Sequence, residues 1–211
     1  LLLKSGNDCA VALAEHVGGN VDEFVNMMNK KAYEIGAKDT HCTNPHGLDT
    51  EDNYSTAYDI AKITCYAKNI DIISKIMNTE SITVNFGNTA KFLANTNRLL
   101  TTYEYCNGGK TGFTKKARRT LVTTASKDGM NLIVVTFNDG DDFKDHKNLY
   151  EKYFNNFKVV KVLNKGDKYG FDSYIGKDFK IIVNDSDNYS TNVVVDNKEG
   201  KRNGEIVGKV E

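Results

Sequence analysis

The strongest constraint on the fold is a pair of apolar, β-branched segments that flank a tight turn. Residues 119–126 and 130–138 are rich in Val, Leu, Ile and Thr, and Lys127-Asp128-Gly129 separates them. An Asp-Gly turn between two such segments is typical of an antiparallel hairpin. Both segments are apolar at successive rather than alternate positions, so the sequence predicts that other elements cover both faces of this sheet.

Helical patterns precede this hairpin, and one follows it. Apolar residues recur three and four positions apart, as in a helix with one buried face. We expect helices at residues 5–18, 21–35, 55–69, 70–77 and 141–155. Ser55 is the predicted N-cap of the third of these helices. A polar loop is predicted over 37–54, and alternating apolar residues predict a strand over 81–86.

From about residue 157 the sequence changes to short β-prone segments separated by Gly, Asp and Asn. These segments are residues 157–163, 179–183, 192–195 and 205–210. Their pattern predicts a small all-β domain. The whole chain is therefore predicted to have an α+β fold: an antiparallel sheet packed with helices over 1–155, and a separate β-rich domain over 156–211.

Charge and composition exclude several classes of protein. The chain has 28 basic and 28 acidic side chains, whereas a protein that neutralises nucleic-acid phosphates is normally basic, so we expect no nucleic-acid partner. No apolar segment approaches the roughly 20 residues that span a bilayer. The four cysteines, Cys9, Cys42, Cys65 and Cys106, form no Cys-x-x-Cys pair. We therefore expect buried free thiols, and neither a metal site nor a cofactor.

Two short motifs carry the candidate chemistry. A Ser-Gly-Asn sequence occupies 5–7, and a Gly-Lys-Thr-Gly sequence occupies 109–112, just before the apolar hairpin. Each motif is weak alone, because both occur often by chance. Together they match two of the three elements of the active-site serine penicillin-recognising enzymes, which are Ser-x-x-Lys, Ser-x-Asn and Lys-Thr-Gly.

Further segments extend the match in chain order over 1–155. They are residues 2–8, 24–36, 40–48, 55–59, 97–100 and 108–114. On these segments the sequence resembles the low-molecular-mass penicillin-binding proteins, the serine-type D-alanyl-D-alanine carboxypeptidases. The β-rich remainder is similar in general character to the C-terminal domain of that family. The resemblance implies a penicillin-binding, β-lactamase-like fold and removal of a terminal D-alanine through an acyl-enzyme.

The resemblance assigns catalytic roles to three residues. Lys110 supplies positive charge beside the substrate carboxylate and the Ser5 hydroxyl. Ser5 passes a proton towards the leaving amine. Asn7 hydrogen-bonds the substrate amide and the motif lysine.

The resemblance assigns substrate-binding roles to the residues around Lys110. Thr111 offers its hydroxyl to the substrate carboxylate, Gly112 leaves room for the substrate backbone, and the Phe113 N–H is one oxyanion-hole donor. Arg98 is a candidate for carboxylate binding, and packing or an ion pair is an equally good interpretation. The family often has glycine near Arg118, so the local strand geometry stays open there.

The third sequence element is absent. None of the serines in the chain has lysine three positions later. The serines are Ser5, Ser55, Ser74, Ser81, Ser126, Ser173, Ser186 and Ser190. In this family the nucleophilic serine and its lysine base precede Ser-x-Asn. We therefore expect this chain to be the C-terminal portion of such an enzyme, unable by itself to form an acyl-enzyme. We also expect a second copy or an N-terminal part to cover the exposed sheet edge.

Two alternatives stay open at this point. A class A β-lactamase-like hydrolase usually has Asp where this chain has Gly6, and it lacks the β-rich tail. A non-catalytic peptide-binding or wall-associated module is the other alternative. In the leading interpretation the partners are peptidoglycan stem peptides that end in D-Ala-D-Ala, β-lactams are inhibitors, and the protein works outside the cytoplasmic membrane.

Overall fold

The computed structural model describes residues 1–168, 174–184, 186, 193–195 and 208–210. The chain divides into two compact units. One contains residues 1–127 and 131–152, and the other contains residues 128–130 and those from Tyr153 onward. The predicted domain boundary at residue 155 stays a prediction.

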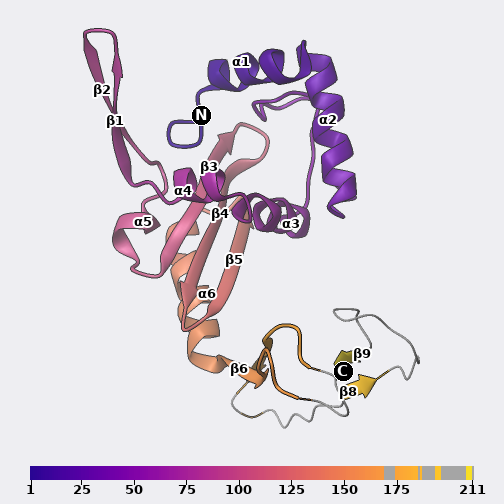
Figure 1. Cartoon of the computed structure of the whole chain (residues 1–211). Coiled ribbons are helices and arrows are strands. Elements are labelled where there is room, and N and C mark those ends of the chain that lie inside the picture. The colour runs from indigo at the N-terminus through magenta and orange to yellow at the C-terminus, as the bar shows by residue number, and fades with distance from the viewer. Residues whose placement is uncertain (169–173, 185, 187–192, 196–207, 211) are drawn as a thin grey trace. The chain divides into compact units, whose positions relative to one another are not determined.

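Two helices begin the first unit (Figure 1). They are α1 (Asn7–Gly18) and α2 (Val21–Glu34), close to the predicted ranges. A Cβ atom at Gly18 would lie 2.7 Å from the backbone nitrogen of Phe24, so the helices approach this closely only because residue 18 is glycine. The Asn20 side chain accepts a hydrogen bond of 2.8 Å from the Glu23 N–H and so caps α2.

The next two helices are α3 (Ala57–Lys68) and α4 (Asp71–Met77). The predicted N-cap of α3 was wrong, because Thr56 and not Ser55 accepts the hydrogen bond from the Asp59 N–H. The Ser55 hydroxyl is instead 2.8 Å from that of Thr40. Thr40 also donates to the buried Asp59 carboxylate, so this cluster fastens the preceding loop to α3.

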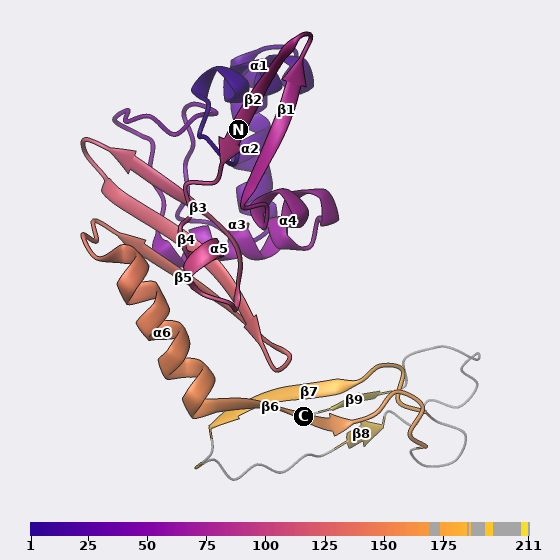
Figure 2. The same ribbon diagram turned by 90° about the vertical axis from the view of Figure 1, so that its left-hand side faces the viewer.

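Strands β1 (Ser81–Phe86) and β2 (Thr89–Ala94) form an antiparallel hairpin. The sequence predicted β1 but not β2, in which Leu93 interrupts the alternation of Ala90, Phe92 and Ala94. The short helix α5 (Leu99–Thr102) was not predicted either. The hairpin projects away from the other elements of its unit (Figures 1 and 2).

The central sheet has three strands in the order β3-β4-β5. They are β3 (Cys106–Thr114), β4 (Arg118–Lys127) and β5 (Met130–Phe137). The predicted hairpin is confirmed as β4 and β5. Asp128 and Gly129 have φ angles of 50° and 80°, which a two-residue type I′ turn requires.

Helices cover both faces of this sheet, as predicted. On one face, α6 (Asp142–Asn156) packs over β4 and β5. Thr123 of β4 lies there, 2.7 Å from both His146 Nδ1 and Tyr150 Oη, and Thr136 of β5 is 3.1 Å from His146 Nε2. Burial lowers the pKa of His146 to about 4. On the other face, α3 and α4 contact β4 and β3 (Figure 2).

Among its described residues, the second unit has two short antiparallel strand pairs. Strand β6 (Phe157–Leu163) pairs with β7 (Phe179–Asn184), and β8 (Val193–Val195) pairs with β9 (Gly208–Val210). The strands predicted at 157–163 and 179–183 are confirmed. The predictions at 192 and 205–207 lie outside the described residues.

All four cysteines are free thiols, but burial was predicted correctly only for Cys106 and in part for Cys42. Cys9 and Cys65 are exposed, because each lies on the outer face of its helix. None of the helices in the described part of the chain is long and apolar enough to cross a bilayer.

Candidate active site

The first site residue lies in a tight turn before α1. Ser5 has a φ angle of 55°, in the left-handed region that residues other than glycine rarely adopt. Its N–H donates to the Leu1 carbonyl at 2.7 Å, which closes the turn, and α1 begins two residues later. Such strain persists where the surrounding structure holds it, and it is common at functional sites. Here it directs an exposed hydroxyl towards β3.

Lys110 of β3 meets this hydroxyl. Its ammonium group donates to Ser5 Oγ and also to the Thr111 carbonyl. Burial lowers the pKa of Lys110, because an ammonium group is less well solvated in the protein than in water. A cation and a hydroxyl that are 105 positions apart in the sequence are thus joined directly. The pair can hold an anionic ligand group and pass a proton through the Ser5 hydroxyl.

The backbone before Lys110 helps to direct its side chain towards the Ser5 hydroxyl. A bulge lies between Cys106 and Gly108, and Gly109 has a φ angle of 146°. A Cβ atom at Gly109 would collide with the Val122 carbonyl of the neighbouring strand. Position 109 therefore requires glycine for both its conformation and its space.

The three residues after Lys110 run along β3 and face solvent to different degrees. Thr111 is half-buried, and its hydroxyl lies 2.7 Å from that of Thr96. Gly112 is exposed, and so is Phe113, whose side chain is 65 % accessible. Because β3 is an edge of the sheet among the described strands, this segment can receive an extended peptide.

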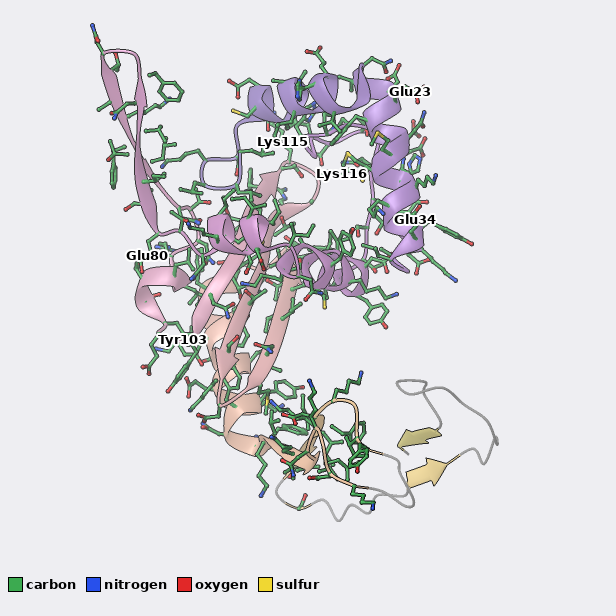
Figure 3. The ribbon with its side chains drawn as sticks, in the orientation of Figure 1. Glu23, Glu34, Glu80, Tyr103, Lys115 and Lys116 are labelled. Carbon is green, nitrogen blue, oxygen red and sulfur yellow. The ribbon has the colours of Figure 1, made fainter. Side chains whose placement is uncertain are left out.

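The loop over residues 37–54 borders this edge. The Asp49 carboxylate accepts a hydrogen bond of 2.9 Å from the Lys116 N–H, in the turn after β3. That bond, with a second from the Thr114 side chain, lowers the pKa of Asp49. Figure 3 shows Lys116 at the tip of the β3–β4 hairpin. At the other end of the loop, the Asn29 amide bonds both the N–H and the carbonyl of Cys42, at 2.7 and 2.8 Å.

The structure does not bring every predicted residue into these contacts. Asn7 is the first residue of α1 and is exposed, and its side chain makes no hydrogen bond to another described residue. The Arg98 guanidinium lies 4.7 Å from the centre of the Phe143 ring. The same ring lies near Arg119, which bonds the Asp142 carboxylate at 2.7 and 3.2 Å. These contacts support packing for Arg98, and its role in carboxylate binding stays a prediction.

Sequence reasoning missed three residues that support the site: Thr96, Asn97 and Asp49. Asn97 is almost completely buried and donates to the Gly108 carbonyl at 3.2 Å. It lies in a segment that carries the family resemblance, which is the only signal that could have singled it out. Arg118 has a φ angle of 61°, so the chain adopts a glycine-like conformation where the family often has glycine.

Comparisons with known proteins agree with this arrangement. A model of the D-alanyl-D-alanine carboxypeptidase family, peptidase family S11, matches residues 1–141. The chain is 41% identical over 138 residues to D-alanyl-D-alanine carboxypeptidase DacF of Bacillus subtilis, which covers 65% of this chain and 36% of the relative. It is 39% identical over 136 residues to DacB2 of Mycobacterium tuberculosis, which covers 64% of this chain and 46% of the relative. The chain thus spans less than half the length of these relatives.

Solved structures give the same result. Penicillin-binding protein 5 of Haemophilus influenzae superposes with a TM-score of 0.79 at 31% identity, over 99% of this chain and 66% of that one. The predicted fold class, a sheet packed with helices as in penicillin-binding proteins, is therefore confirmed. Since the family model covers most of the chain and the motif residues Ser5 and Lys110 are in contact, the chain belongs to the D-alanyl-D-alanine carboxypeptidases, the low-molecular-mass penicillin-binding proteins.

Proposed function

We propose that this site binds the C-terminal D-alanine of a peptidoglycan stem peptide in a serine D-Ala-D-Ala carboxypeptidase. The observation that carries the proposal is the contact of the Lys110 ammonium group with the Ser5 hydroxyl and with the carbonyl of Thr111, whose hydroxyl is the neighbouring donor on β3. A cation and a hydroxyl donor are suited to a terminal carboxylate, because both interact more strongly with an anion than with a neutral amide.

The edge of β3 supplies the rest of the binding surface. The substrate backbone pairs with this edge, and exposed Gly112 leaves space for it. The N–H of Phe113 acts as one oxyanion-hole donor, and Asn7 holds the substrate amide. As the peptide bond breaks, Ser5 gives a proton to the departing D-alanine nitrogen, and the positive charge of Lys110 makes the Ser5 hydroxyl a better proton donor.

Acyl transfer further needs a nucleophile and its base, and the 211 residues contain no Ser-x-x-Lys sequence. We propose that such a segment completes the site. Its serine oxygen bonds the substrate carbonyl carbon, D-alanine leaves with the proton, and water then hydrolyses the ester. Penicillins acylate the same serine. By itself, the 211-residue chain forms no acyl-enzyme.

The same proposal implies what the protein binds and where it acts. The substrate is a cell-wall peptide, so the protein acts outside the cytoplasmic membrane. The outer edge of β5 has no strand partner among the described residues. A strand from a second copy or from an N-terminal part of the enzyme pairs with it, because a free apolar edge favours aggregation. In this proposal, residues 1–155 belong to the catalytic domain, and residues 156–211 form a separate β-rich domain.

A titration observed by NMR tests the peptide-binding function. We expect a peptide ending in D-Ala-D-Ala to shift the amide signals of Lys110 to Phe113, and the L-Ala-L-Ala peptide to shift them much less. Lys110→Met should abolish this difference, whereas Lys91→Met on exposed β2 should retain it. Equal shifts with both peptides would contradict the function.

Incubation with a fluorescent penicillin tests the need for the missing nucleophile. We expect no labelled band after denaturing electrophoresis of the 211-residue chain. A covalent band would overturn the proposal that the chain alone is inactive, without affecting the peptide-binding function.

A further inference from the structure

Two threonines that are 15 positions apart in the sequence share a hydrogen bond at the edge of the site. Thr96 follows β2, and Thr111 follows Lys110 in β3. Their hydroxyl oxygens are 2.7 Å apart. Thr96 is exposed, and no motif of the family resemblance contains it.

The segment that carries Thr96 is fastened on both sides. Before it, the Asn95 N–H donates to the Glu80 carbonyl at 2.7 Å, and the Asn95 side chain donates to the Thr79 carbonyl at 3.0 Å. After it, the buried Asn97 side chain donates to the Gly108 carbonyl of β3 at 3.2 Å. The backbone of Thr96 is therefore held in place relative to β3, and its hydroxyl meets Thr111 without further ordering of the chain.

Counting protons gives the direction of the hydrogen bond when a substrate is bound. A threonine hydroxyl has one proton to donate and two lone pairs that accept. A carboxylate only accepts, so Thr111 must use its single proton to bind it. The remaining bond between the two hydroxyls must then be donated by Thr96. In that state the Thr96 hydroxyl donates to the Thr111 oxygen. The Thr111 hydroxyl is thereby oriented so that its own proton points at the carboxylate.

We infer that Thr96 is a positioning residue for the Thr111 hydroxyl, and that it thereby strengthens the preference of the site for a free C-terminal carboxylate. The inference rests on the proposed function. Lys110 holds the backbone carbonyl of Thr111, and Thr96 holds its side chain, so the two contacts complement each other. Loss of one hydrogen bond between neutral groups weakens binding about three- to tenfold.

The experiment compares two peptides on three variants. NMR titration of the complete 211-residue chain measures the dissociation constant of a peptide ending in D-Ala-D-Ala and of the same peptide as its C-terminal amide. Thr96→Val removes the hydroxyl and retains the shape, so the carboxylate peptide should bind about three- to tenfold more weakly. The amide peptide should be unaffected. Thr96→Ser should bind like the wild type, as should Thr83→Val on exposed β1.

A double-mutant cycle separates positioning from a direct contact of Thr96 with the ligand. If Thr96 acts through Thr111, Thr96→Val should have no further effect in a Thr111→Val background. A full, independent effect there would overturn the inference. So would unchanged binding in Thr96→Val, or equal weakening of both peptides, which indicates a general structural role.

The wild type separates this inference from the proposed function. If wild-type protein binds the carboxylate peptide no better than the amide, the proposed function fails and the inference fails with it. If the wild type has the preference and Thr96→Val retains it, the inference alone fails.

Discussion

Two antiparallel hairpins of the first unit have similar geometry and different surroundings. In the β3–β4 hairpin, the residues from Leu121 to Ala125 are buried between α6 and the pair α3 and α4. In the β1–β2 hairpin, Phe86 and Phe92 are 65 and 66 % exposed. Both hairpins are antiparallel, and the register is unbroken in β1–β2 and shifted only at the bulge between Cys106 and Gly108 in β3–β4. The two hairpins therefore share antiparallel pairing and differ in packing: β4 is buried, and most of β1 and β2 is exposed.

The largest expected effect on stability comes from replacing a glycine of the β3–β4 hairpin. Gly109→Ala places a Cβ atom against the Val122 carbonyl and forces alanine into a φ angle of 146°. We expect it to lower the free energy of unfolding by about 3 kcal/mol or more, from strain plus overpacking. Denaturant unfolding measures this change.

The matched control is Gly87→Ala in the turn of β1–β2. Gly87 also has a positive φ, of 57°, but nothing lies within 4 Å of its added Cβ atom. We expect a cost of about 1 kcal/mol, from the backbone conformation alone. Equal losses in the two variants would contradict the view that packing around β3 and β4 makes the difference.

The second largest effect on stability is expected from Thr123 of the β3–β4 hairpin, and Thr83 of the β1–β2 hairpin is its control. Thr123→Val leaves the buried His146 and Tyr150 groups without their shared hydroxyl partner. We expect it to lower the free energy of unfolding by about 2 kcal/mol. Thr83→Val on exposed β1 should change it by less than about 0.5 kcal/mol. Thermal unfolding of both variants checks the contrast, and a large loss in Thr83→Val would break it.

The buried His146 should make stability depend on pH. Its pKa falls from 6.5 to about 4 in the folded state, chiefly through burial, although Asp142 and Asp139 oppose the shift. Below pH 6.5 the unfolded chain binds a proton that the folded chain does not. Stability is therefore complete above pH 6.5, and it falls as the pH decreases towards 4.

Denaturant unfolding between pH 7.5 and 4.5 measures this loss. His146→Gln should reduce the slope, at some cost in stability at neutral pH, because glutamine does not titrate. The control His16→Gln, on the exposed side of α1, should keep the slope of the wild type. Identical slopes in all three proteins would contradict the assignment.

The smallest expected effect is in β2. Phe92→Ser removes a large side chain that is 66 % exposed, and we expect the free energy of unfolding to change by less than about 0.5 kcal/mol. Urea unfolding is the measurement. A loss of 2 kcal/mol or more would show that the β1–β2 hairpin is packed in solution, which would remove the contrast between the two hairpins.

Local patterns explain which elements were predictable. The type I′ turn at Asp128 and Gly129, and the helical spacing of α1 and α2, are set by neighbouring residues and are visible in the sequence. In the missed β2, three consecutive apolar residues at 92–94 interrupt the alternation, and α5 has four residues, too few for a periodic signal. The cap of α3 was misplaced by one residue, because Ser55 has a distant partner in Thr40 that only the folded chain reveals.

The sequence by itself determined the family and the types of the main elements, because motifs and periodicity are local properties of the chain. Only the tertiary structure decided which residues meet. It brings Lys110 to Ser5 across 105 positions, joins Thr111 to Thr96, and buries β4 while β1 stays exposed. The physical reason is that such contacts depend on how helices and sheet pack together, and the spacing of residues along the chain does not specify that packing.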